Sequence, residues 1–238
     1  MAKRLFDVIF ALLAIVLSSP ILLIAGLLIW AQDRHPPVYA GIRVGRFDHE
    51  FRMFKLRTMI PDAHSVGGTS TSASDSRLTP LGSALRRFKL DELPQFWNVL
   101  KGDMSIVGPR PNVRAGGVDR YTSEESKLLL VRPGITDLAS IVFSDEGEIL
   151  RDSADPDALY DAVIRPWKSR LALLYVERRS FLLDLALIGL TVISFFSKEA
   201  ALRAIDSILE RWGASDDLRE SCARCDPLPR GVPPGQVA

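Results

Sequence analysis

An uncharged and mostly apolar segment runs from Val8 to Ala31, close to the start of this 238-residue chain. About 20 apolar residues in a helix cross the hydrocarbon core of a bilayer, so the segment is long enough to span a membrane. A secretory signal peptide has a shorter apolar core and a small-residue cleavage site, and we find no convincing site of that kind here. We therefore expect this segment to hold the chain at a membrane.

Ser18, Ser19 and Pro20 lie in the middle of the apolar segment. Proline removes one backbone hydrogen bond and clashes with the preceding turn, while nearby serine hydroxyls can satisfy the carbonyls freed in this way. A helix bent here could return to the face that it entered. Basic residues flank both ends, with Lys3 before the segment and Arg34 after it, and both flanks favour the cytoplasmic side. These observations leave a spanning helix and a re-entrant helix equally open.

The whole chain has 47% hydrophobic residues, 25% charged residues and a net charge of +1. This composition fits one globular domain plus an anchor. The near-neutral charge argues against nucleic acid as a partner. Cys222 and Cys225 form a Cys-x-x-Cys pair, but a structural zinc site usually needs four Cys or His ligands, so we assign the pair no role. Without a disulfide framework, a reducing, cytosolic environment is expected for the globular part.

Hydrophobic patterning after the anchor predicts a small α/β (α+β) globular domain with one small sheet and surrounding helices, several of them interfacial. Short strands are expected at 38–39, 42–44 and 51–54, a long polar loop at 62–80, and helices at 81–88, 94–100, 123–131 and 156–178, the last interrupted near Pro166. The apolar stretch 181–196 is short for a span, so it either packs in the core or lies on the membrane surface, and the core is the default expectation.

Two adjacent carboxylates, Asp91 and Glu92, stand in the string LDELPQFWNVLKGDMSIVGPRP at 90–111. Pro94 predicts that a helix starts here, and at a helix start one carboxylate can act as a cap while its neighbour reaches outward. Such a terminus favours anions, and Arg86 and Arg110 could bind phosphate oxygens beside it. A lone Asp-Glu pair is more simply explained as a cap with surface ion pairs.

Neighbouring strings make the simple explanation less adequate. KLRTM at 55–59 precedes the pair, and GDMS at 102–105 and GPRP at 108–111 follow it within twenty residues. A Pro-Arg-Pro turn holds the guanidinium of Arg110 rigidly, which suits bidentate recognition of a phosphate. The strings together indicate a phosphoryl-transfer site.

Over roughly residues 2–195 the chain resembles the bacterial sugar transferase family of monotopic phosphoglycosyl transferases, which initiate the assembly of surface glycans and glycoconjugates such as exopolysaccharides. The matching strings are KRLFDVIFALLAIVLSSPILLIAGLLI in the anchor, FKLRTM at 54–59, LRRFKLDELPQFWNVLKGDMSIVGPRP at 85–111, RPGIT at 132–136 and YVERRSFLLDL at 175–185. Together they are far more specific than a single short motif.

The resemblance implies transfer of a sugar 1-phosphate from a UDP-sugar to polyprenyl phosphate, with release of UMP and a requirement for Mg²⁺. Asp91 matches the family's covalent nucleophile, where the metal is also expected, and Glu92 matches the second member of the dyad. The family's anchor is a re-entrant helix broken at a Ser-Pro pair, here Ser19 and Pro20. The implied location is the cytoplasmic face of the bacterial inner membrane, with the lipid bilayer as a partner and a homodimer left open.

The expected organisation is a re-entrant anchor at 1–34, a cytosolic catalytic domain at 35–212 and a tail at 213–238 that its Pro, Gly and charge content predicts to be disordered. Since the family strings start at the beginning of the given sequence, we expect a minimal family member. A carboxylate can attack the β-phosphorus only if cations mask the charge of the phosphates. The residues that we expect to do so are Arg86 and Arg110 first, and then Lys55, Arg57 and Arg132.

Some positions depart from the family pattern. RPGIT continues with Asp137 to Ser140 where many members have Gly-Trp-Ala-Gln, and Arg178 stands where Asn is frequent, so the contacts to sugar and nucleotide stay open. The acidic stretch at 144–158 is interpreted as a solvated insertion. Two other classes of protein compete with a transferase. A membrane-attached scaffold explains the anchor but not the dyad, and a membrane phosphatase would use similar aspartyl-phosphate chemistry with water as the acceptor.

Overall fold

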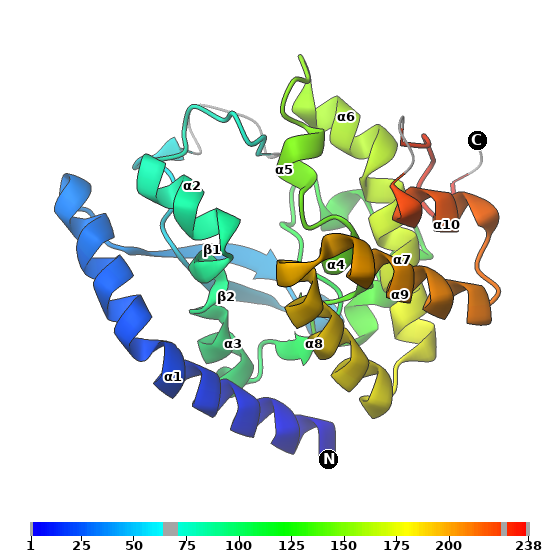
Figure 1. Ribbon diagram of the computed structural model, residues 1–238, viewed down its shortest axis with the longest axis horizontal. Helices are drawn as coiled ribbons and strands as arrows, with labels where there is room; N and C mark the ends of the chain where they lie inside the picture. The colour runs from blue at the N-terminus through cyan, green and yellow to red at the C-terminus, as the bar shows by residue number, and fades with distance from the viewer. Residues whose placement is uncertain (1, 64–70, 225–227, 237–238) are drawn as a thin grey trace.

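The computed structural model describes residues 2–63, 71–224 and 228–236 (Figure 1). Its first half contains α1 (Ala2–Asp33), β1 (Val38–Val44), η1 (Arg46–Asp48), β2 (Glu50–Leu56), α2 (Pro80–Arg87), η3 (Leu90–Glu92), α3 (Gln95–Lys101) and β3 (Ser105–Val107). The second half contains η4 (Val118–Arg120), η5 (Glu125–Leu130), β4 (Gly134–Thr136), α4 (Leu138–Val142), α5 (Glu146–Ile149), α6 (Pro156–Val163), α7 (Arg165–Arg178), α8 (Phe181–Phe196), α9 (Lys198–Arg211) and α10 (Asp216–Ala223).

Helix α1 is the one helix in the described ranges that is long and apolar enough to cross a membrane. It remains a single 32-residue element with Pro20 inside it, so the expected interruption is not seen as a break. Figure 1 shows it curving along one side of the molecule, against α3. Proline leaves the carbonyl of Val16 without its usual N–H donor, and the hydroxyl of Ser19 donates to that oxygen at 2.8 Å. The predicted compensation by serine is therefore confirmed.

Only one face of α1 packs against the domain. Asp7 and Ala11 are buried there, and Phe10 lies beside Phe96 of α3, with ring centroids 6.1 Å apart. Most of the other large apolar side chains are exposed, including Leu12, Leu13, Val16, Leu17, Leu23, Ile24, Leu27 and Leu28. A helix that exposes so much apolar surface is typical of a segment that lies in lipid.

The predicted small sheet is present as two separate pairs of strands. β1 and β2 form an antiparallel hairpin in which Val38 pairs with Leu56 and Val44 with Glu50. β3 and β4 form a short parallel pair. A Cβ on Gly134 would lie 2.1 Å from the backbone nitrogen of Gly108, so only glycine permits this approach. The two glycines thus bring GPRP and RPGIT together.

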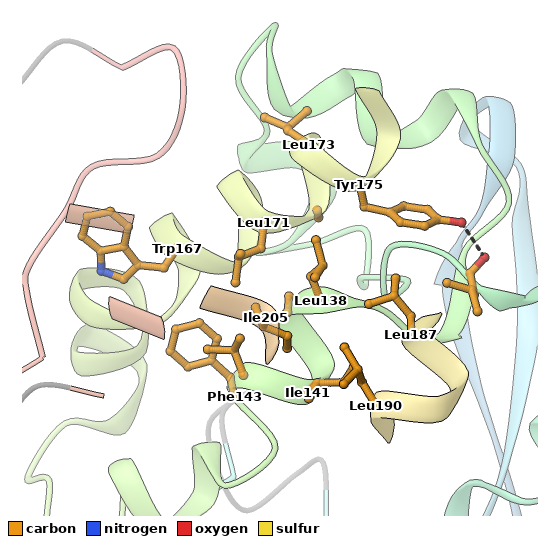
Figure 2. Packing of buried hydrophobic residues seen from close by; sticks show 14 of the residues in the cluster. Leu138, Ile141, Phe143, Trp167, Leu171, Leu173, Tyr175, Leu187, Leu190 and Ile205 are labelled. Carbon is orange, nitrogen blue, oxygen red and sulfur yellow. Dashed lines mark hydrogen bonds between the residues drawn. The ribbon is translucent and has the colours of Figure 1, made fainter. Parts of the chain in front are cut away.

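The main core lies where α4, α7, α8 and α9 meet. Figure 2 shows Leu138 and Ile141 facing Leu171, Leu187 and Ile205 from these helices. The expected interruption near Pro166 is confirmed, because α6 ends at Val163 and α7 begins at Arg165. α8 fits both interpretations offered for it: Leu183, Leu187 and Leu190 are buried, whereas Leu182 and Phe196 are 77% and 88% exposed.

The chain after residue 213 differs from the expected disordered tail. Residues 216–223 form α10, which packs on α9 and buries Leu218 and Cys222. Further on, the indole of Trp167 donates to the carbonyl of Pro229 at 2.8 Å. A few apolar side chains therefore suffice to hold a segment whose average composition is polar. Cys225 and part of the predicted loop, residues 64–70, lie outside the described residues.

The other predicted elements match in place, with two differences of form. The three short strand predictions merge into two seven-residue strands, because the glycine at 41 stays paired inside β1. The helix predicted at 123–131 is the 3₁₀ element η5. The helices predicted at 81–88 and 94–100 are α2 and α3, each within one residue of the expected bounds.

Candidate active site

The dyad lies on the short turn η3 between α2 and α3. Lys89, just before it, has a φ of 52°, a left-handed conformation that turns the chain sharply after α2. α3 begins at Gln95 after Pro94 and has no side-chain cap, so neither carboxylate caps the helix, in contrast to the expectation. The carboxylates of Asp91 and Glu92 are therefore available for other interactions.

Glu92 is held by two cations. Arg110 donates to both of its carboxylate oxygens, at 3.1 Å to Oε2 and closely to Oε1, and Lys55 lies 3.2 Å from Oε1. Burial alone would raise the pKa of Glu92, but the charges of Arg110 and Lys55 outweigh it and push the pKa well below the ordinary value. Glu92 is therefore a fixed, ionised carboxylate at neutral pH.

Asp91, in contrast to Glu92, has no cation bound to its carboxylate in the described part of the chain. It is 5% exposed and makes no hydrogen bond or ion pair there. Burial raises its pKa above the ordinary value, and the charge of Lys55 only partly offsets this. The two carboxylates of the dyad therefore have opposite environments, a desolvated one at Asp91 and an ion-paired one at Glu92.

Three of the five predicted cations gather around the dyad, from three separate segments. Lys55 comes from β2 and Arg110 from the turn after β3, and both bind Glu92. Arg86, in the last turn of α2, donates through Nε to the hydroxyl of Thr58 at 2.9 Å, and its charge acts on Asp91. The KLRTM, LRRFKLDE and GPRP strings thus meet at one place.

The other two predicted cations have different partners. Arg57 forms a two-pronged ion pair with Asp33, at 2.6 and 2.7 Å, which ties the end of α1 to the domain. Arg132 donates to the carbonyl of Gly102 at 3.0 Å and lines a cavity of about 250 Å³ with Arg46 and His49. Neither arginine contacts the dyad in the structure.

Three further charged residues, to which the sequence assigns no role, act on the dyad and its cations. Lys89 is one of the basic residues that frame the dyad in the sequence, and its charge acts on Glu92 and Arg110. Glu146 and Lys168 form an ion pair whose charges both act on Arg110. Position next to the dyad could have indicated Lys89, whereas no local signal links Glu146 to Lys168.

The acidic stretch at 144–158 is therefore not simply a solvated surface. Asp145 pairs with Lys198 and with Arg224, the latter at 2.9 Å, and Glu146 pairs with Lys168. Leu150, in the same stretch, is completely buried. The interpretation as a solvated insertion is wrong for these residues.

A preformed cage for a metal ion is not present among residues 2–63, 71–224 and 228–236, where no three His, Cys, Asp or Glu residues are grouped to hold an ion. Mg²⁺ does not need such a cage, since it usually keeps several waters and binds one or two carboxylates together with substrate phosphates. Asp91 is the carboxylate here that has unengaged oxygens. The donor set fits Mg²⁺ that arrives with a phosphate ligand.

Comparison with known proteins agrees with this geometry. The family model described as "Bacterial sugar transferase" matches residues 1–198. A UDP-N-acetylgalactosamine-undecaprenyl-phosphate N-acetylgalactosaminephosphotransferase from Aeromonas hydrophila is 39% identical over 143 residues, covering 59% of this chain and 34% of that protein. A UDP-glucose:undecaprenyl-phosphate glucose-1-phosphate transferase from Klebsiella pneumoniae is 34% identical over 203 residues, covering 84% and 41%.

Relatives of similar length are also found. The exopolysaccharide production protein PSS of Rhizobium leguminosarum is 35% identical over 202 residues, covering 81% of this chain and 94% of that protein. The chain spans only about a third of the Aeromonas protein and two fifths of the Klebsiella protein. With the family model matched over most of its length and the dyad at the centre of the match, the chain belongs to the bacterial sugar transferase family.

Proposed function

We propose that the protein transfers a sugar 1-phosphate from a UDP-sugar to polyprenyl phosphate and releases UMP, as the first membrane step of glycan or exopolysaccharide assembly. The observation that carries the proposal is the dyad: a buried Asp91 that has no hydrogen-bond or ion-pair partner among the described residues, beside a Glu92 that Arg110 and Lys55 hold ionised. The names of the Aeromonas and Klebsiella relatives specify UDP-sugar donors and undecaprenyl-phosphate acceptors, which supports the same assignment.

In the first displacement, a carboxylate oxygen of Asp91 attacks the β-phosphorus of the donor. A new bond forms between that oxygen and phosphorus, the bond from phosphorus to the bridging oxygen breaks, and UMP leaves with the electron pair. Arg86 and Lys55 lie close enough for their charges to act on Asp91, so they can balance the added negative charge. Mg²⁺, bound through Asp91 and phosphate oxygens, would supply further charge neutralisation.

In the second displacement, an oxygen of polyprenyl phosphate attacks the same phosphorus. The bond to Asp91 breaks, the carboxylate is regenerated, and the product is a polyprenyl-diphosphate sugar. The covalent intermediate lets UMP leave before the lipid phosphate enters, so two bulky anions need not occupy the site together. Glu92 keeps Arg110 and Lys55 in place through both steps.

The anchor is proposed to be re-entrant, with the domain on the cytoplasmic face. Both ends of α1 bind the same domain: Lys3 pairs with Asp184 at 2.5 Å, and Asp33 pairs with Arg57. A helix that crossed the bilayer would carry one of these ends to the far side. The curvature of α1 and the hydroxyl of Ser19 bound near Pro20 support a helix that enters and leaves by one face.

Release of UMP tests the proposed reaction directly. Detergent-solubilised protein with Mg²⁺, polyprenyl phosphate and a panel of UDP-sugars should release UMP with at least one sugar and form a lipid-linked product. Asp91→Asn should abolish both. Release of free sugar phosphate in place of the lipid product would indicate a phosphatase. A folded native protein that releases no UMP with any donor would indicate a scaffold, and unchanged UMP release by Asp91→Asn would show that Asp91 is not the nucleophile.

A further inference from the structure

A cavity of about 250 Å³ lies where the turn of the β1–β2 hairpin meets the segments after α3 and before β4. Neither Asp91 nor Glu92 lines this cavity, and the two displacements give it no role. The residues in its wall that carry the argument below are Arg46, Phe47, His49, Gly102, Asp103 and Arg132.

Two arginines bring positive charge to the cavity. Nε of Arg46 donates to the carbonyl of Leu130 at 3.1 Å, and Nε of Arg132 donates to the carbonyl of Gly102 at 3.0 Å. Within the described ranges, neither guanidinium has a carboxylate partner, and the Nη nitrogens make no hydrogen bond. Guanidinium groups held in this way through Nε keep their remaining N–H groups available for the oxygens of a phosphate.

The carboxylate in the wall of the cavity does not neutralise these arginines. Asp103 accepts hydrogen bonds from Nζ of Lys101 at 3.0 Å and from the side-chain amide of Asn98 at 3.2 Å. Because the charge of Lys101 matches that of Asp103, the charges of Arg46 and Arg132 remain in excess. A concave surface with an excess of positive charge attracts anions.

The cavity adjoins the first turn of the apolar helix α1. Arg4 donates to the carbonyls of Val99 and Leu100 at 2.6 and 3.0 Å, just before the chain reaches Gly102. A Cβ on Gly102 would lie 3.4 Å from the guanidinium of Arg4. Basic groups beside a helix that lies in lipid attract the anionic headgroups of the membrane surface. The position of the cavity therefore favours a lipid as the source of the anion.

Exposed apolar side chains accompany the arginines. Phe47 is 67% exposed, and its φ of 57° is a left-handed conformation that residues other than glycine rarely adopt. Its ring centroid lies 4.2 Å from the guanidinium carbon of Arg46. Leu130, whose carbonyl accepts from Arg46, is 55% exposed. Apolar side chains next to cations match an amphiphile with an anionic headgroup and apolar chains.

The size of the cavity also favours a headgroup over a whole nucleotide sugar, because pockets for complete small-molecule ligands usually measure about 300–1,000 Å³. We propose that Arg46 and Arg132 bind the phosphate of an anionic membrane phospholipid, with Phe47 and Leu130 against its acyl chains near the headgroup. The domain is then held at the bilayer at a second point besides α1. This binding does not depend on the proposed sugar transfer.

Native mass spectrometry of the full-length protein in detergent micelles tests the proposal. Titration with phosphatidylglycerol and with zwitterionic phosphatidylcholine gives a dissociation constant for each lipid. Their ratio removes the apolar contacts that both lipids share, including those with α1. We expect the native protein to bind phosphatidylglycerol about 10-fold more tightly, as charge-assisted hydrogen bonds to a phosphate would give. The ratio should fall towards one in Arg46→Gln and in Arg132→Gln.

Arg203→Gln is the matched control, because it removes the same charge from α9, where the side chain of Arg203 is 74% exposed. This variant should keep the native ratio. Arg46 and Arg132 are both exposed residues, so their substitution should leave Tm unchanged. If Arg132→Gln does not fold, Arg46→Gln on the hairpin turn decides the test alone.

Three results would overturn the inference. A native ratio near one, or a native ratio retained in the folded cavity variants, would show that these arginines do not select an anionic lipid. Displacement of phosphatidylglycerol by an equal concentration of inorganic phosphate would show a site for free phosphate. Displacement by a UDP-sugar would assign the cavity to the donor. Because UMP release is not the readout, failure of the proposed function would leave this test intact.

Discussion

Adjacent carboxylates with opposite environments are the central feature at the scale of residues. Arg110 and Lys55 lower the pKa of Glu92, whereas burial raises the pKa of Asp91. Neighbouring titratable groups whose pKa values are pushed apart are typical of sites where two acids have two roles. This contrast supports the proposal that Glu92 orients the cations and that Asp91 reacts.

The dyad has a consequence for stability. The raised pKa of Asp91 means that its charged form is disfavoured in the folded state, so it destabilises the protein increasingly as pH rises from its unfolded pKa through its folded pKa. Asp91→Asn should therefore raise Tm at pH 7, by about 2–4 °C for each kcal/mol of stability gained. Below about pH 4, near the unfolded pKa of Asp, the difference should vanish. Thermal unfolding in detergent at both pH values measures it.

Glu92→Gln should lower Tm at pH 7, whereas Asp91→Asn should raise it. The lowered pKa of Glu92 contributes stability that is present above its unfolded pKa and is lost as pH falls through its folded pKa. The substitution also leaves Arg110 and Lys55 without a carboxylate, so Tm at pH 7 should fall, and the rate of UMP release should fall by about 100-fold because the cations lose their positions. A Glu92→Gln variant as stable and as active as the native chain would contradict the assignment of roles.

Sequence reasoning located part of this site, for physical reasons. Asp91, Arg86 and Arg110 belong to continuous strings, so their neighbourhood could be read from the chain. Arg57 looked equivalent to Lys55, two residues away, but its ion pair with Asp33 takes it to the anchor instead. Glu146 meets Lys168 only because α5 and α7 pack together, and patterning does not predict such a contact between distant residues.

At the scale of elements, α1 is the helix that we propose holds the domain at the membrane. Its N-terminal half packs on α3 and β3. The apolar run and the proline could be read from the sequence, and so could the role of the serines. The sequence does not predict that the helix continues through Pro20, because this depends on the hydrogen bond from Ser19 to Val16 and on packing against the domain.

The re-entrant proposal predicts the topology of both helix ends. In a Cys222→Ala, Cys225→Ala background, Ala2→Cys and His35→Cys should both react with an impermeant maleimide from the cytoplasmic side of sealed vesicles, because both ends of α1 bind the same domain. Permeabilised vesicles give the total labelling as a control. Labelling of the two positions from opposite sides would show a spanning helix.

At the scale of the whole molecule, the anchor is part of the folded domain. The hydroxyl of Ser105 and the backbone N–H of Ile106 donate to Asp7, and Lys3 pairs with the buried Asp184. The hydroxyl of Tyr175 donates to the carboxylate of Asp184 at 2.7 Å. The composition of the chain predicts an anchor attached to a separate domain. It does not predict that Lys3 and Asp7 of α1 form hydrogen bonds and an ion pair with residues inside the domain.

Removal of Lys3 tests this integration with the least disturbance. Lys3→Met leaves the carboxylate of Asp184 buried, with Tyr175 as its remaining side-chain donor among the described residues. Breaking a fully buried pair costs on the order of 3 kcal/mol, and the cost should be smaller here because the side chain of Lys3 is 39% exposed. Tm in detergent should fall by about 2–4 °C per kcal/mol. The double variant Lys3→Met, Asp184→Asn should recover part of the loss, because no unpaired charge remains.

Deletion of α1 should have a larger effect than either substitution. A chain that begins at Arg34 exposes Phe96 and Leu100 on α3, and it leaves Ser105 and Asp184 without their partners in the anchor. We therefore expect it to aggregate or to unfold non-cooperatively, and not to yield a soluble enzyme. Size-exclusion chromatography and thermal unfolding decide this, with Lys3→Met as the folded control. A soluble, monodisperse deletion variant with a cooperative transition would show that the domain folds without its anchor.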